Sequence, residues 1–194
     1  MILLAALILG LLIGWGVSRW QHVPYRAPEL RHLWLVPASL IPQLAASYWP
    51  RLWGKVPVAA AAAVLPVSLV GFLAFVLLNR RLPGMPVLLI GLVLNLAVIT
   101  LNGGWMPVSP ETASHLPGGS PPESAAVGTR VDDKSILLRA EDTSLEFLAD
   151  RFLLPAMGGY RAAVSLGDMF IAAGAFWLLA RAPDAPHPQR RDDA

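Results

Sequence analysis

The stretch Met85–Glu111, MPVLLIGLVLNLAVITLNGGWMPVSPE, holds the two features that decide the fold. Its first part, 85–101, carries no charge and predicts a helix that crosses a membrane. Its second part ends that helix, because the Asn-Gly-Gly sequence at 102–104 adopts left-handed backbone conformations at little cost. Trp105 suits a membrane interface, and the Met-Pro pair that follows it keeps the chain extended. The stretch therefore predicts a membrane helix that stops at the membrane surface.

Composition extends this prediction to the whole chain. Of the 194 residues, 55% are hydrophobic and 14% are charged, whereas soluble domains carry about 25% charge. The net charge of +2 gives no basis for nucleic-acid binding. There is no cysteine, which excludes disulfides, thiolate metal sites and cysteine nucleophiles. We expect an all-α membrane protein whose partners are the lipid bilayer and other membrane protein subunits.

Apolar stretches predict about five transmembrane helices. They cover residues 1–18, 33–49, 56–78, 85–101 and 163–181. The second stretch is the least regular, because Pro37 and Pro42 each remove a backbone donor and favour a kink or break. It is also short, so both a full span and a half-inserted segment stay open. The tail, 182–194, is rich in proline and charge, and we expect it to be disordered.

The distribution of arginine predicts that the N-terminus lies outside and the C-terminus inside. Cytoplasmic loops carry an excess of Lys and Arg. With five spans, arginines gather in the first loop, the third loop and the tail: Arg19, Arg26, Arg31, Arg80, Arg81, Arg181, Arg190 and Arg191. The first span starts without the positive residues of a secretory signal, so we expect a retained anchor.

The segment 102–162 differs from the rest and is expected to be extracytoplasmic. It holds five Lys or Arg against eight Asp or Glu. Ser109 and Pro110 predict the start of a short helix. Near 144–154 the sequence TSLEFLADRFLLP starts with a capping-box pattern and places its apolar residues on one face. This pattern predicts a short amphipathic helix at the membrane surface.

Asp168 is the only acidic residue within the predicted spans. An acid at membrane depth is by default a functional candidate, as a proton relay, cation site or counter-ion. A structural interpretation competes with it, because Ser165 stands three residues earlier. If Ser165 caps the last helix, Asp168 lies in the first turn, where the helix dipole favours a negative charge. Both interpretations stay open, and the cap is the favoured one.

The remaining candidates lie on the outer side. Asp150 and Arg151 could form a site with Asp168, although a solvated surface is the more common role of such residues. The turn residues Asn102, Gly103, Gly104, Met106 and Pro107 either end a helix or form a rigid docking loop. Gly10 and Gly14 form a GxxxG pair that allows close helix packing.

Several chemistries are not predicted. The four histidines, His22, His32, His115 and His187, are scattered and lack ligand neighbours at metal-binding spacing, so we predict no metal site. There is no phosphate-binding glycine loop and no nucleophile elbow, and we predict no catalytic residue. No cofactor is predicted either. Apolar helices of this kind can nevertheless bind a lipid or a hydrophobic pigment.

Three motifs, NGGWMPVSPE, FLADRFLLP and SLGDMFIAAG, occur together in this order. Their combination resembles a family of small bacterial multi-pass membrane proteins classed as a domain of unknown function. The matching positions are Asn102, Gly103, Gly104, Met106, Pro107, Asp150, Pro155, Ser165, Gly167 and Asp168. The resemblance implies a fold and a multi-pass location in the bacterial inner (cytoplasmic) membrane, but no activity.

Three functions fit these observations. The favoured one is a non-enzymatic membrane subunit or scaffold that docks a partner through its helices and outer segment. The second is a small transporter or proton-coupled permease with Asp168 as the titrating group. Its polar lining would be Gln43 and Asn95, the latter the only strongly polar residue of the span 85–101. The third is a membrane enzyme acting on a lipid or isoprenoid at the outer leaflet, which would need Asp150, Arg151 and Asp168 to converge.

Overall fold

The computed structural model describes residues 2–48, 57–117, 126–132, 134–155 and 161–181, and within these ranges the protein is mostly helical. The α-helices are α1 (Ile2–Trp20), α2 (Leu35–Tyr48), α4 (Val58–Leu78), α5 (Met85–Leu101), α6 (Pro110–Ser114) and α7 (Leu166–Ala180). Five of them match the predicted apolar stretches, and α2 continues through Pro42 without a break. The predicted tail 182–194 lies outside the described residues.

Two of these helices, α1 and α4, are long and apolar enough to cross a membrane. The other three apolar helices are shorter, and α7, with 15 residues, is about 23 Å long. This is less than the thickness of a bilayer core, about 30 Å. Length and composition therefore support two membrane-crossing helices rather than the five spans that the sequence predicts.

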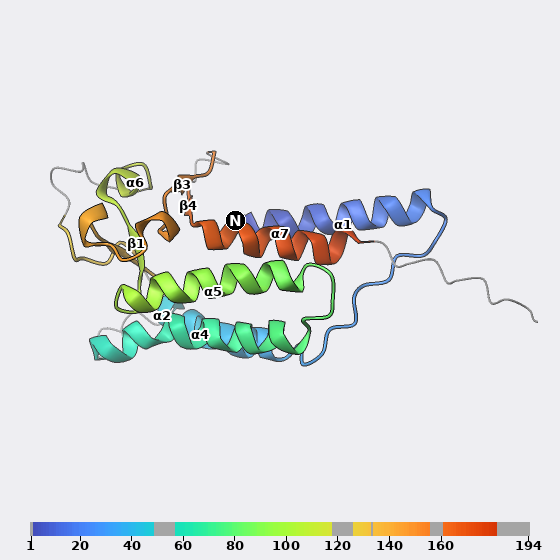
Figure 1. The fold of residues 1–194 in the computed structure, drawn as a ribbon, viewed down its shortest axis with the longest axis horizontal. Coiled ribbons are helices and arrows are strands. Elements are labelled where there is room, and N and C mark those ends of the chain that lie inside the picture. Colours follow the sequence, from blue (N-terminus) through green and yellow to red (C-terminus); the bar gives the residue numbers. More distant parts are fainter. Residues whose placement is uncertain (1, 49–56, 118–125, 133, 156–160, 182–194) are drawn as a thin grey trace, which may run out of the picture.

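The long helices form a row in which α1 packs on α7, α7 on α5, α5 on α4 and α4 on α2 (Figure 1). The two end members, α1 and α2, lie far apart in the row although they are consecutive in the chain. The helix α7, which comes last in the sequence, therefore lies between α1 and α5. This order makes the C-terminal helix the element that joins the first helix to the rest.

Glycines make the two interfaces of α7 close. On one side, a Cβ atom at Gly91 would lie 2.5 Å from the carbonyl oxygen of Gly167, and one at Gly174 would lie 2.6 Å from the backbone nitrogen of Leu88. On the other side, a Cβ atom at Gly10 would lie 2.7 Å from the carbonyl oxygen of Phe176. Gly10 and Gly14, the predicted packing pair, thus face α7 of the same chain.

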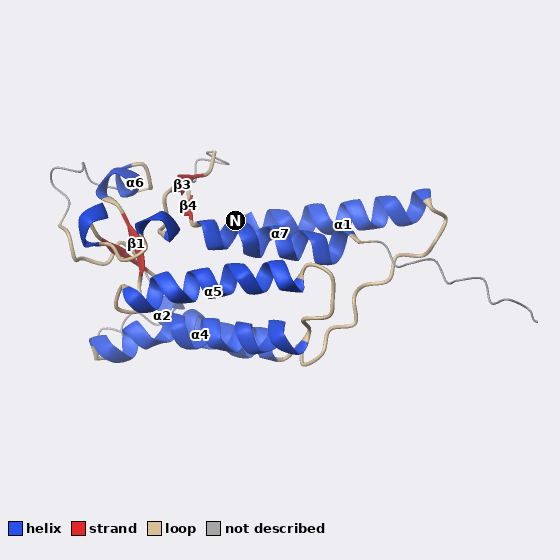
Figure 2. Cartoon of the chain, in the orientation of Figure 1, coloured by secondary structure: helices blue, strands red, loops and turns tan. Residues whose placement is uncertain are grey.

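Short strands gather at one end of the bundle, beside α6 (Figure 2). The strand β1 (Met106–Val108) pairs in parallel with β2 (Ser135–Leu137), and β3 (Phe152–Leu153) pairs antiparallel with β4 (Ala163–Val164). Two 3-10 turns, η2 (Ala140–Asp142) and η3 (Glu146–Leu148), connect them. We call this part, 102–117 with 126–132, 134–155 and 161–165, the cap.

The amphipathic helix predicted near 144–154 is wrong. Only η3 is helical there, and the chain then enters β3. Leu145 has a left-handed backbone, with φ of 56°, which interrupts any helix. Thr143 is not an N-cap, since Leu145 holds that position of η3. It instead ends η2, and its hydroxyl donates to the carbonyl of Arg139. The pairing of β3 with β4 and the bridge between Asp150 and Val108 have overridden the local pattern.

The opposite end of the bundle carries basic residues. Arg19 lies in the last turn of α1, Arg80 and Arg81 lie in the turn between α4 and α5, and Arg181 follows α7. These three positions lie at the end away from the cap (Figure 1). The fold therefore separates a basic end from a capped end.

Candidate functional site

The Asn-Gly-Gly turn that ends α5 joins the helices to the cap. Asn102 caps the helix, and its Nδ2 donates to the carbonyl of Val98 at 2.7 Å. The same side chain donates to the carbonyl of Ser144 at 2.9 Å and accepts from its backbone N–H at 3.0 Å. Gly103 and Gly104 have φ values of 72° and 89°, which favour glycine. The structure thus gives this turn a structural role.

Ser165 and Asp168 form a capping box at the start of α7. The Ser165 hydroxyl accepts from the backbone N–H of Asp168 at 3.0 Å, and the Asp168 carboxylate accepts from the Ser165 N–H at 3.3 Å. Asn95 of α5 joins this pair, since its Nδ2 donates to Asp168 Oδ1 at 2.7 Å and its Oδ1 accepts from the Ser165 hydroxyl at 2.9 Å. The network locks α7 to α5 and shows Asp168 in the role of a helix cap.

Asp150 is positioned by β1 and held by Lys134. Its backbone N–H donates to the carbonyl of Pro107 at 3.1 Å, and Met106 donates to the carbonyl of Lys134 at 2.8 Å. These two bonds bring the carboxylate of Asp150 within 3.3 Å of the Lys134 ammonium. The Asp150 side chain is 4% exposed, whereas that of Lys134 is 50% exposed. The second carboxylate oxygen, Oδ1, is buried without a hydrogen-bond partner among the described residues.

Electrostatic coupling links this ion pair to Asp168. Burial raises the pKa of Asp150 to about 6, although Lys134 acts in the opposite direction. Burial also lowers the pKa of Lys134, but the carboxylates of Asp150, Asp168 and Asp132 outweigh it, so the pKa is raised. Of these carboxylates, Asp150 is the one in contact with the Lys134 ammonium, and the others act on its pKa from further away.

Arg151 does not join this cluster. Its guanidinium forms an exposed ion pair with Glu146 at 3.1 Å, which contributes little stability because solvent screens it. The cation paired with Asp150 is thus Lys134 and not the neighbouring Arg151. Sequence reasoning missed Lys134, because its pairing depends on β1 and β2, which no local pattern reveals.

A cavity of about 670 Å³ lies between the five long helices, and we call it the central groove. Apolar side chains from all five helices line it, and the strand residues Ala163 and Val164 help to close it at the cap. The polar lining residues are Gln43, Asn95, Lys134 and Asp168. A volume of this size is typical of sites for small molecules.

The polar lining residues are not spread along the groove. Lys134 belongs to the cap, Asp168 to the first turn of α7, and Asn95 to the half of α5 nearer the cap. Gln43 lies just past the middle of α2, in the half that leads toward the cap (Figure 1). Toward the basic end the lining is apolar and includes Val76, Met85 and Leu178. In the described ranges, no three His, Asp or Glu residues gather as a metal site would require.

The comparisons with known proteins give a family and no function. No curated protein and no solved structure matches the chain. A family model described as a family of unknown function, DUF5317, matches residues 28–180. This range covers α2 to α7 and all the cap, and leaves out α1. The chain belongs to the DUF5317 family of unknown function.

Proposed function

We propose that this protein is a multi-pass membrane protein, of the bacterial inner membrane, that binds one amphiphilic molecule in the central groove. The observation that carries the proposal is the asymmetry of the groove lining: its polar residues lie in the half nearer the cap, among apolar ones, whereas the lining toward the basic end is apolar. An amphiphile has the matching asymmetry, with an apolar tail and a polar head. In this proposal the protein acts as a binding protein rather than as an enzyme.

The membrane placement rests on the apolar surface and on the arginines. Large hydrophobic side chains on the outer faces of the helices are exposed, for example Leu4, Ile8 and Leu12 of α1. Such a surface suits a bilayer and not water. The basic end would face the cytoplasm, because inner loops are enriched in Lys and Arg. In this proposal the three shorter apolar helices, α2, α5 and α7, cross the bilayer together with α1 and α4. The protein would then have five spans, with the N-terminus and the cap outside.

Entry to the groove would lie between α1 and α2. These helices are the two ends of the row, and among the described residues they share no close packing. A tail could therefore enter sideways from the lipid phase, without crossing the cap. The volume of about 670 Å³ suits a single amphiphile of moderate size.

The head group would meet Lys134. Its ammonium has three N–H donors, and the structure pairs it with Asp150 Oδ2. The remaining donors favour a head group with acceptor oxygens, such as hydroxyls, carbonyls or a zwitterion. A multiply charged anion is disfavoured, because Asp150 and Asp168 already surround this ammonium with negative charge.

This proposal takes precedence over a partner-docking scaffold for a specific reason. The GxxxG pair Gly10 and Gly14 faces α7 of the same chain, so this pair is not available to a partner helix. Transport through Asp168 has less support as well, since Asn95 and Ser165 hold its carboxylate in a helix cap. A partner's transmembrane helix seated in the groove is the competing occupant.

The experiment is native mass spectrometry of the protein released from its membrane in mild detergent, with lipid extraction of the same sample. We expect one bound amphiphile per chain. In Lys134→Met its retention should fall about tenfold, because a hydrogen bond to a charged group is worth about 1.5–3 kcal/mol.

The control is Arg139→Met, which removes an exposed cation of the cap whose partner, Glu141, is exposed too. It should leave retention unchanged. Equal retention in the wild type, Lys134→Met and Arg139→Met would show that Lys134 does not contribute to binding. Co-purification of a membrane protein in place of an amphiphile would favour the scaffold instead.

A further inference from the structure

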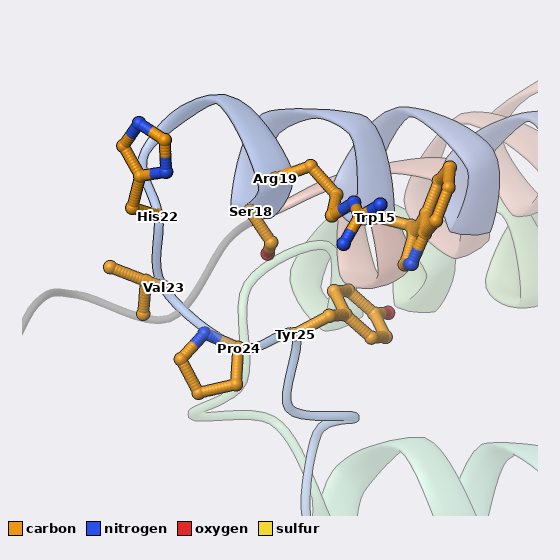
Figure 3. Close-up of a pocket in the computed structure, with 7 residues that line it drawn as sticks. All are labelled: Trp15, Ser18, Arg19, His22, Val23, Pro24 and Tyr25. Carbon is orange, nitrogen blue, oxygen red and sulfur yellow. The ribbon is translucent and has the colours of Figure 1, made fainter.

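A second pocket lies at the basic end of the molecule, outside the central groove. It has a volume of about 590 Å³ and is lined by the last turn of α1 and the loop after it (Figure 3). The lining residues are Trp15, Ser18, Arg19, His22, Val23, Pro24 and Tyr25. These described lining residues include no carboxylate, and the fixed charge among them is that of Arg19.

The Arg19 guanidinium is held by an aromatic ring and not by an acid. It lies 5.4 Å from the centre of the Trp15 ring, a geometry in which the ring quadrupole attracts the cation. In the described part of the chain no carboxylate forms an ion pair with Arg19. A guanidinium that is oriented but not neutralised is prepared to bind an anion.

Ser18 supplies a second feature of the pocket. Its side chain is 1% exposed, and its hydroxyl has no hydrogen-bond partner among the described residues. Figure 3 shows this hydroxyl pointing from α1 toward the hollow above Pro24 and Tyr25. A buried hydroxyl without a partner is costly, and a ligand oxygen in the pocket would relieve that cost.

The backbone that closes the pocket is unusual. His22 has φ of 57°, and Val23 donates to the carbonyl of Ser18 at 3.0 Å. This bond closes the end of α1 with a turn in which the left-handed position ordinarily holds glycine. Tyr25 fixes the far wall, because its hydroxyl donates to the carbonyl of Leu179 at 3.0 Å.

We infer that this pocket binds the phosphate of a phospholipid head group. Arg19 is the charged donor, the Ser18 hydroxyl is the neutral donor, and Trp15 lies at the level of the head groups, where indole rings accumulate. The inference rests on the membrane placement proposed above, in which this end faces the cytoplasmic leaflet. Anionic lipids of that leaflet are attracted to basic sites of this kind.

The test uses the full chain in nanodiscs of phosphatidylglycerol and phosphatidylcholine in equal parts, released gradually into native mass spectrometry. We expect the protein to retain phosphatidylglycerol in excess. In Arg19→Gln this excess should fall about tenfold, as expected for one charge-assisted hydrogen-bonded contact. Arg19→Lys should show an intermediate loss, because an ammonium keeps the charge without the planar fork of donors.

Arg80→Gln is the matched control, since Arg80 is exposed and belongs to the same basic end. It should keep the excess, and thermal unfolding should show that all variants fold. An excess that is equal in Arg19→Gln and Arg80→Gln would overturn the inference. Displacement of the lipid by inorganic phosphate would overturn the lipid part and assign the pocket to the free anion.

The two proposals fail separately. Retention in the central groove depends on Lys134 and does not involve Arg19, whereas the phosphatidylglycerol excess depends on Arg19 and does not involve Lys134. A protein that keeps its groove ligand but shows no lipid preference contradicts only the inference about the basic end.

Discussion

The amide of Asn95 donates a 2.7 Å hydrogen bond to the carboxylate of Asp168, 73 residues away in the sequence. The same amide accepts from the buried hydroxyl of Ser165, so one side chain of α5 satisfies both members of the α7 capping box. The contact lies where the groove meets the cap. It therefore fixes the position of the polar end of the proposed binding site.

Replacing Asn95 with Leu should destabilise the protein by about 2–3 kcal/mol, because it leaves Ser165 and Asp168 without their buried partner. The measurement is thermal or denaturant unfolding in detergent. Thr100→Val, on the same helix, removes an exposed hydroxyl that bonds only to its own helix, and it should change stability by less than about 0.5 kcal/mol. Equal losses in the two variants would show that the network is not stabilising.

The sequence predicts features that depend on neighbouring residues and misses features that depend on residues far apart in the chain. The Ser165 cap and the end of α5 at Asn102 depend on neighbouring residues, so spacing alone predicts both. The pairing of Lys134 with Asp150 depends on strands that are distant in sequence. The helix expected near 144–154 is replaced by η3 and by β3, which pairs with β4 outside that stretch. Asn95 gave a signal as the only strongly polar residue of its span, but its partners could not be named.

Close packing of α1 on α7 predicts a difference between two glycines of the same helix. A Cβ atom at Gly14 would meet the carbonyl oxygen of Leu179, whereas one at Gly16 would meet nothing within 4 Å. Gly14→Ala should therefore cost about 1–3 kcal/mol through overpacking. Gly16→Ala should be neutral or stabilise by up to about 1 kcal/mol. Unfolding in detergent compares them, and a harmless Gly14→Ala would contradict this helix packing.

Stability should fall as the pH rises from about 4 to about 7. Burial raises the pKa of Asp150 from 3.8 to about 6. Lys134 lowers this pKa, whereas Asp168 and Asp132 also raise it. A carboxyl whose pKa is raised on folding stabilises below its unfolded pKa, and that contribution is lost as the pH passes the folded value. The loss should reach about 2–3 kcal/mol.

The variant that isolates this effect is Asp150→Asn, in which the pH-dependent loss should disappear. Asp142→Asn, at an exposed position of η2, should retain it. The measurement is the unfolding midpoint across this pH range in the wild type, Asp150→Asn and Asp142→Asn. A pH dependence that survives in Asp150→Asn would assign it to another group.

The absence of cysteine allows the proposed orientation to be tested without background labelling. In intact cells a membrane-impermeant thiol reagent should label Ala126→Cys, which lies in the cap. It should label Arg80→Cys, at the basic end, only after permeabilisation. Labelling in the reverse order would place the cap in the cytoplasm and contradict the orientation.

Blocking the central groove tests the proposed function most directly. Leu40 lines the groove, whereas its neighbour Ile41 on α2 is 62% exposed and points away from it. The measurement is the number of amphiphile molecules retained per chain in Leu40→Trp and Ile41→Trp, by native mass spectrometry after release in mild detergent. The account predicts that Leu40→Trp loses the ligand while Ile41→Trp and the wild type keep one. Equal retention in Leu40→Trp and Ile41→Trp, or no bound amphiphile in the wild type, would contradict it.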